Sequence, residues 1–202
     1  MIKNIRWVLI LCVFASGVLC FASCKKKITN RQDLIAYINE PQNGLQKAKQ
    51  IGDIKVTITY RPAQLMLGKN SSLITKAGKE NDSLYKNQLF FVLSISAKNK
   101  ELLRQLEFSK YSEMVQVLAF RMKEFISGIP GDGKPVEPLD CVFQQTYGMG
   151  SANNVLIVFN KKELLRAPNL KIGIKEFGLQ TGNLDFEFKT EDIKNLPTTV
   201  LN

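Results

Sequence analysis

The chain contains no histidine, and this absence removes several classes of site at once. Without histidine there is no Ser-His-Asp triad, no Cys-His pair and no metal site that uses imidazole. Cysteine is also scarce, because three of the four cysteines lie within the first thirty residues and Cys141 stands alone in the body. An internal disulfide bond and a cysteine-rich metal site are then excluded from the body. We expect no metal ion and no other cofactor.

The composition is that of an ordinary globular protein. The chain has 202 residues, of which 45% are hydrophobic, so extensive disorder is excluded and one domain, two at most, is expected. A repeated βαβ period is absent, which argues against a doubly wound nucleotide-binding fold. The sequence also shows no internal repeat.

The first residues have the pattern of an export signal. Lys3 and Arg6 precede an apolar run over residues 7–22 that is interrupted only by Ser16 and Gly17. As a helix this run would rise about 24 Å, which is short of the roughly 30 Å hydrocarbon core of a bilayer. A positive start followed by a short apolar run is typical of a signal peptide, here residues 1–23.

The residues Phe21-Ala22-Ser23-Cys24 end this run, and they resemble the lipobox of bacterial lipoproteins. The resemblance implies cleavage between Ser23 and Cys24 and acylation of Cys24, which would anchor the protein to a membrane. Cys20 is a poorer candidate, because the bulky Leu19 precedes it. The alternative is a plain secretory signal with an incidental cysteine at position 24.

The positive charge is concentrated near the expected anchor. The net charge is +10, but Lys3 and Arg6 would leave with the signal, and Lys25, Lys26, Lys27 and Arg31 lie in the tether. Nucleic-acid binding needs a basic face on the body, so we do not expect it. The lysines at 25–27 could contact anionic headgroups, or they could form a solvated linker. Lys25 stands where lipoproteins kept in the inner membrane carry Asp, so the resemblance favours the outer membrane.

Short periodic segments fill the rest of the chain. Residues 24–50 are expected to form the lipid anchor, a basic tether and a short helix around 34–38, capped by Asn30 or Asp33. Residues 51–202 are expected to form one domain. Alternating or continuous apolar residues predict strands near 54–60, 89–95, 119–127, 139–146, 155–159, 170–174 and 184–188. Residues 101–126 are ambiguous, because Met114, Leu118 and Met122 repeat at helical spacing while Phe120, Met122 and Ile126 alternate as in a strand. We place a helix near 109–118 and the strand near 119–127. Residues 66–87 read as a long polar loop or a helical excursion.

This pattern predicts a mainly β fold, an antiparallel β-sandwich of the immunoglobulin-like kind with about seven strands and one or two short helices. A lipobox, a short N-terminal segment and a β-rich body together resemble small envelope lipoproteins of Gram-negative bacteria. The resemblance implies an envelope location and supplies no catalytic residues.

Few residues suggest chemistry. Gly148-x-Gly150 lacks the third glycine of a dinucleotide fingerprint and reads as a tight loop, and Pro130-Gly131-Asp132-Gly133 reads as a turn. Cys141 reads as a small buried hydrophobe. Asp185 and Glu187 share one strand face, which could serve acid–base work but is more simply a solvated face. Asp82-Ser83-Leu84 resembles an O-glycosylation site of envelope proteins, with Ser83 as the acceptor.

Two functions remain open at this point. The first is a non-enzymatic lipoprotein, anchored through Cys24, that binds another envelope protein or stabilises an assembly. The second is a carbohydrate-binding or carbohydrate-cleaving lipoprotein that uses carboxylates. Its candidate sugar platforms are Tyr60, Tyr85, Tyr111 and Tyr147, although core packing explains most of these tyrosines more simply. An exposed apolar patch or an unpaired strand edge favours the first, and a cleft lined by two acids favours the second.

Overall fold

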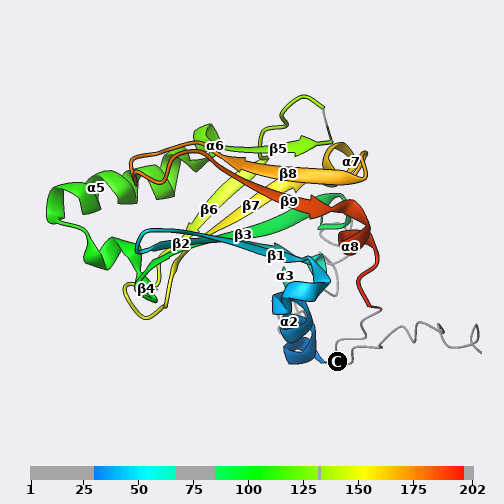
Figure 1. The fold of residues 1–202 in the computed structure, drawn as a ribbon, viewed down its shortest axis with the longest axis horizontal. Coiled ribbons are helices and arrows are strands. Elements are labelled where there is room, and N and C mark those ends of the chain that lie inside the picture. Colours follow the sequence, from blue (N-terminus) through cyan, green and yellow to red (C-terminus); the bar gives the residue numbers. More distant parts are fainter. Residues whose placement is uncertain (1–29, 67–84, 132, 198–202) are drawn as a thin grey trace, which may run out of the picture.

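The computed structural model describes residues 30–66, 85–131 and 133–197 (Figure 1). The expected signal peptide, the cleavage site at Ser23 and Cys24, the lysines at positions 25–27 and Ser83 lie outside the described residues. No described helix is long and apolar enough to cross a bilayer.

The larger sheet is antiparallel throughout and has the strand order β1-β2-β3-β7-β6, with the short β4 paired to β3. Its strands are β1 (Gln46–Ile51), β2 (Ile54–Arg61), β3 (Gln88–Ala97), β4 (Lys100–Glu101), β6 (Asp140–Gln144) and β7 (Asn153–Asn160). β3 lies in the middle, and its residues Leu89, Phe91 and Leu93 are fully buried. This strand therefore holds the sheet together.

The smaller sheet has the order β5-β8-β9, formed by β5 (Ile126–Pro130), β8 (Asn169–Ile174) and β9 (Leu184–Lys189). Along β9, Leu184, Phe186 and Phe188 are buried and the residues between them are exposed. Each buried face must pack against another layer, because exposed apolar surface costs about 25 cal/mol per Å². The two sheets supply that cover for each other, and β1 contacts β9 along one side.

The core is centred on Phe91 in β3. Its ring lies 5.7 Å from Tyr60 in β2, 6.4 Å from Phe159 in β7 and 5.3 Å from Phe188 in β9 (centroid distances). Because Phe188 belongs to the smaller sheet, this aromatic group joins the two layers. The mainly β, antiparallel β-sandwich expected from the sequence is confirmed.

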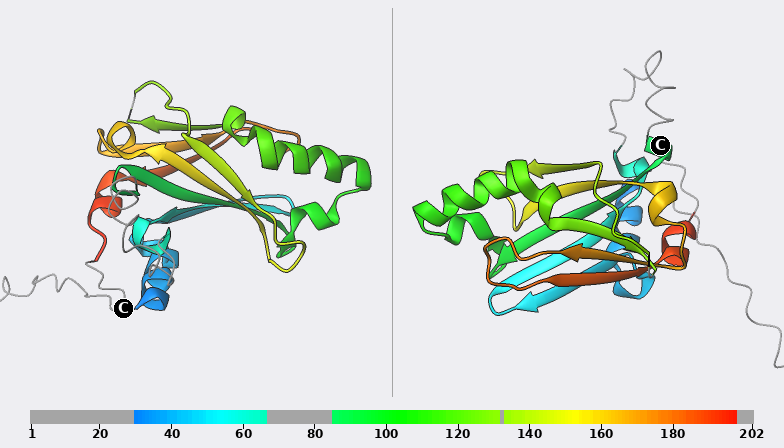
Figure 2. Two further views of the ribbon diagram at one scale, coloured as in Figure 1. Left: turned by 180° about the vertical axis from the view of Figure 1, so that it is seen from behind. Right: turned by 90° about the horizontal axis from the view of Figure 1, so that it is seen from above.

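One long helical segment completes the layer of the smaller sheet (Figures 1 and 2). It consists of α5 (Phe108–Gln116), a π-helical turn η4 (Val117–Arg121) and α6 (Met122–Phe125), and it runs directly into β5. The shorter helices are α2 (Arg31–Asn39), η1 (Pro41–Asn43), α3 (Ala63–Met66), η3 (Leu102–Gln105), α7 (Lys161–Leu164) and α8 (Thr190–Lys194). In all views α5 and α2 lie at opposite ends of the molecule.

The strand expected near 119–127 is wrong, because the chain stays helical to Phe125 and β5 begins at Ile126. Met114, Leu118 and Met122 are buried at spacings of four, which is the period of a helix. Phe120 is 84% exposed, so it does not share a face with Met122 as the alternation suggested.

The part of the chain that the structure describes contains nine strands, two more than expected. The additional strands are β1 and the two-residue β4. Residues 46–50 therefore belong to the sheet rather than to the tether, and Leu34 and Ile38 of α2 are part of the core. The expected cap is present, since the Asn30 side chain accepts a hydrogen bond from the Asp33 N–H at 2.7 Å. The compact body thus includes residues that precede position 51.

Candidate functional site

A pocket of about 480 Å³ opens at the end of the sandwich where α5 stands apart from the larger sheet. Its volume lies in the range of small-molecule sites. The apolar part of the lining is formed by Leu103, Leu106, Phe108, Tyr111, Val115 and Phe143. The polar part is formed by Glu101, Arg104, Gln145, Thr146, Gly148 and Asn153, with Tyr147 at the same loop.

Glu101 forms one wall of this pocket and is 3% exposed. Its carboxylate accepts hydrogen bonds from Gly148 N–H and Gly150 N–H, each at 2.8 Å, and from the Thr146 hydroxyl. Burial raises the pKa of Glu101, but these bonds and the charge of Arg104 outweigh it, so the pKa lies below its usual value. The carboxylate is therefore charged at neutral pH and ties the loop to the end of β4.

A buried side-chain hydrogen bond also holds η3, the segment that follows Glu101. The side chain of Asn153, 2% exposed, accepts a hydrogen bond from Leu103 N–H at 2.9 Å. This bond fixes η3, which carries Arg104 to the pocket.

Gly148 leaves room for the Arg104 side chain. A Cβ atom at this glycine would lie 2.3 Å from Arg104 Nη1, and its φ of +84° is unfavourable for other residues. The guanidinium approaches the Gly148 carbonyl at 3.4 Å, which is a long contact. Among the residues that the structure describes, Arg104 forms no ion pair within 4 Å. Most of its donors are therefore free to meet a ligand.

Large apolar side chains are exposed around the pocket. Phe108 and Tyr147 are 85% and 82% exposed, Tyr111 is 41% exposed, and all three line the pocket. We call these three residues the aromatic rim. Single exposed apolar residues are common, but a group at the mouth of one pocket is typical of a binding surface.

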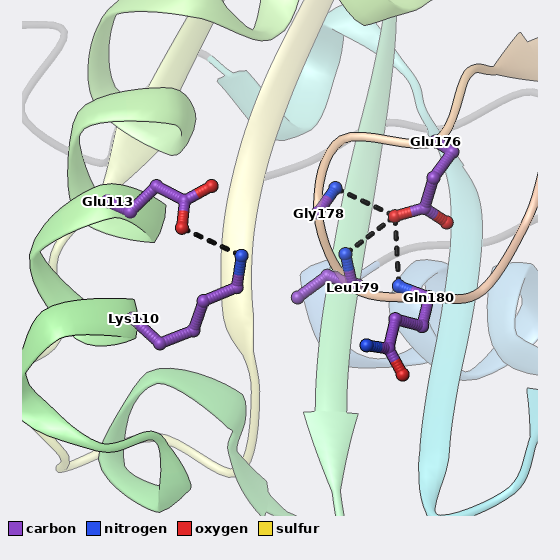
Figure 3. Close-up of polar contacts among 6 residues, drawn as sticks. All are labelled: Lys110, Glu113, Glu176, Gly178, Leu179 and Gln180. Atoms are coloured by element: carbon purple, nitrogen blue, oxygen red, sulfur yellow. Dashed lines mark hydrogen bonds and ion pairs between the residues drawn. The ribbon is translucent and has the colours of Figure 1, made fainter.

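A second carboxylate, that of Glu176, organises a loop that lies beside α5 (Figure 3). Glu176 accepts hydrogen bonds from the N–H groups of Gly178, Leu179 and Gln180 at 2.6–2.9 Å. Its burial raises the pKa, but the backbone donors outweigh this effect and lower it. The loop that it organises packs on α5, where a Cβ atom at Gly178 would lie 3.1 Å from Met114 Cε. The Lys110–Glu113 ion pair, at 2.7 Å, lies on the facing side of the helix.

The candidate acids of the sequence do not form a site. Asp185 and Glu187 are exposed on β9, and Asp185 pairs with Lys171 at 3.2 Å, so the solvated face is confirmed. Within the described ranges, no three or more Cys, Asp or Glu side chains are grouped so that they could hold a metal ion.

Cys141 is half-buried on β6 and packs against the core. Burial, together with a smaller effect of the neighbouring Asp140, raises the pKa of its thiol to about 12. A nucleophilic thiolate at this position is therefore not supported at neutral pH.

The sequence did not reveal the role of Glu101. Gly148-x-Gly150 forms the tight loop that was expected, but its amides bind a carboxylate 47 and 49 residues earlier in the chain. The only signal in the sequence was the pair of glycines near Thr146. Their N–H groups indicate that the loop binds a hydrogen-bond acceptor, but the sequence does not identify the residue that supplies it.

No protein-family model matches the sequence, and no curated protein matches it. Among solved structures, the chain is similar to the crystal structure of a DUF4426 family protein from Pseudomonas aeruginosa PAO1. The identity is 12% and the TM-score 0.36, over 72% of this chain and 94% of the other.

Proposed function

We propose that this protein is an envelope lipoprotein, anchored through Cys24, whose sandwich is a non-catalytic module that binds or stabilises another envelope component. The aromatic rim around the pocket is the observation that carries the binding role. Three exposed aromatic side chains, Phe108, Tyr111 and Tyr147, line this one pocket. Aromatic residues are enriched where proteins meet.

The position of α2 supports this arrangement. Asn30, the cap of α2, is six residues beyond Cys24, and six extended residues span at most about 22 Å. The α2 end of the sandwich would therefore stay close to the membrane. α5, which carries Phe108 and Tyr111 of the aromatic rim, lies at the opposite end (Figure 2), so the rim would face the aqueous side, within reach of a partner.

A carbohydrate ligand is the second candidate, because Tyr111 and Tyr147 both line the pocket. Cleavage by paired carboxylates has less support, since Glu101 is the one acid among the described lining residues. Its oxygens are already engaged by three donors of the protein itself. A glycan array probed with the full-length protein distinguishes sugar binding from protein binding.

Replacing Cys24 with serine is expected to abolish membrane attachment. Each buried methylene of an acyl chain contributes about 0.8 kcal/mol, so loss of the acylated residue removes the anchor. Fractionation of cells, together with metabolic labelling by a fatty acid, measures the change. Cys20→Ser is the matched control and should stay lipidated and membrane-bound. Unchanged lipidation of the Cys24→Ser protein would show that the anchor lies elsewhere.

Cross-linking in living cells tests the binding role. A photoreactive phenylalanine analogue at Tyr147, on the aromatic rim, is expected to give one reproducible adduct with an envelope protein. The same analogue at Gln32, an exposed position on α2 at the other end, should not give it. A lipidated, folded protein that yields no adduct from position 147 would contradict the proposal.

A further inference from the structure

The outer edge of β6 is closed in its first half and open in its second half. β6 is the last strand of the larger sheet, and β7 is its neighbour on one side. Near its start, Lys123 Nζ donates to the Leu139 carbonyl at 2.8 Å, and Cys141 N–H donates to the Asp140 carboxylate at 2.8 Å. These contacts occupy edge groups that another strand would need.

Backbone groups alternate along an antiparallel strand, so the direction of Cys141 N–H also fixes that of Phe143. Because Cys141 N–H turns away from β7, the N–H and C=O of Phe143 point outward as well. Gln145, two residues further on, makes no backbone hydrogen bond to any residue that the structure describes. The edge over residues 143–145 is thus available for pairing.

This open edge borders the pocket. Phe143 and Gln145 line one side of it, and Phe108, Tyr111 and Val115 of α5 line the other. A strand added beside Phe143 would place its alternate side chains on the pocket side of the sheet. Apolar side chains would then meet the aromatic rim and the apolar lining, where burial is favourable.

The charge at this site selects among such strands. The oxygens of Glu101 are engaged by three donors. Arg104 interacts with the Glu101 charge but forms no ion pair with it or with any other described residue, so its guanidinium retains donors for a ligand. The guanidinium can hold a carboxylate through two parallel hydrogen bonds. An acidic or C-terminal group on the ligand therefore complements the site.

An open strand edge, an apolar pocket and a guanidinium that has no ion pair among the described residues together fit one kind of ligand. We propose that the site between α5 and β6 binds an extended peptide that pairs with residues 143–145, buries an apolar side chain in the pocket and places a carboxylate on Arg104. This inference rests on the proposed function, because it names the chemistry of the partner that the binding module would recognise.

The test uses the full-length lipidated protein in detergent and fluorescein-labelled synthetic hexapeptides. The peptides alternate threonine with valine, leucine, phenylalanine or tryptophan, and each is made with a free carboxylate and as an amide. Binding is measured by fluorescence anisotropy up to ~1 mM peptide, the weak end of the useful range. We expect at least one aromatic peptide to bind, and its amide to bind about tenfold more weakly.

Three variants separate the contacts. Arg104→Gln should abolish the difference between carboxylate and amide. Gln145→Pro should weaken the binding of both peptide forms, because proline lacks the outward N–H that would pair with the peptide. The fold should tolerate this change, since proline is accepted on an unpaired strand edge. Gln144→Ala, an exposed neighbour on the strand, is the matched control and should bind like the wild type.

The outcomes are distinct. Absence of binding by every peptide, or binding that Arg104→Gln and Gln145→Pro both leave unchanged, would overturn the peptide site. If the cross-link from Tyr147 still formed in cells, the proposed function would stand and only the peptide mode would fall. If neither peptides nor a cellular adduct were found, both proposals would fail.

Discussion

Replacing Phe91 with alanine is expected to lower the free energy of unfolding by about 3–5 kcal/mol. The side chain is fully buried, and its ring contacts Tyr60, Phe159 and Phe188 in three strands of both sheets. Removing it leaves a cavity between the two layers, and its neighbours can close that cavity only by moving the sheets together. The loss is large compared with the total stability of a domain, which is typically about 5–15 kcal/mol.

Urea denaturation, followed by circular dichroism, measures this loss as a shift in the unfolding midpoint. Phe120→Ala is the matched control, because the same side chain is 84% exposed on η4 and its removal should change stability by no more than about 0.5 kcal/mol. Equal effects of the two substitutions would contradict the central position given to Phe91.

The second large effect is expected from Glu101→Gln. The glutamine keeps the size of the side chain but replaces one of the two acceptor oxygens with an amide donor, which then faces either Gly148 N–H or Gly150 N–H, itself a donor. A buried donor left without an acceptor costs about 1–3 kcal/mol, so the free energy of unfolding is expected to fall by this amount at neutral pH. Glu137→Gln, at an exposed position, serves as the control and should have little effect.

A sharper test is how the difference in free energy of unfolding between the wild type and Glu101→Gln depends on pH. The pKa of Glu101 is lower in the folded protein than in the unfolded chain. The folded state therefore gains stability from this group above the unfolded pKa of about 4.3, and loses it as the pH falls through the folded value. The gap between wild type and Glu101→Gln should be constant from about pH 6 to 8 and narrow in acid. A gap of the same size at pH 3 would show that the carboxylate charge contributes nothing.

Strands with one buried face could be predicted from the sequence, because their alternation is local. The pattern gave the positions of β2, β8 and β9, and in β9 it also gave the buried face. In β2 both faces are buried, because Thr57 and Thr59 are covered as well as the apolar residues between which they lie. β1 could not be found in this way, since its residues QKAKQI are mostly polar and half of them are exposed. This segment is a strand because β2 supplies the backbone partners, and such pairing leaves no mark in the segment itself.

The candidate site was less accessible to such reasoning, because it is assembled from distant segments. The Glu101 carboxylate and the amides that bind it belong to β4 and to the loop before β7. The open half of β6 depends on which backbone groups Asp140 and Lys123 occupy. The exposed positions of Phe108, Tyr111 and Tyr147 also contradict what hydrophobicity alone suggests, which is that such residues belong to the core.

The long helical segment has a mechanical consequence. α5 passes through the π-helical turn and α6 directly into β5, so no loop separates the wall of the pocket from the smaller sheet. A hydrogen bond also stabilises the junction between α6 and β5: Lys175 N–H, just after β8, donates to the Phe125 carbonyl at 2.8 Å. Because the backbone continues from α5 into β5 without a loop, a displacement of α5 would pass directly to β5 and to β8, its neighbour in the smaller sheet.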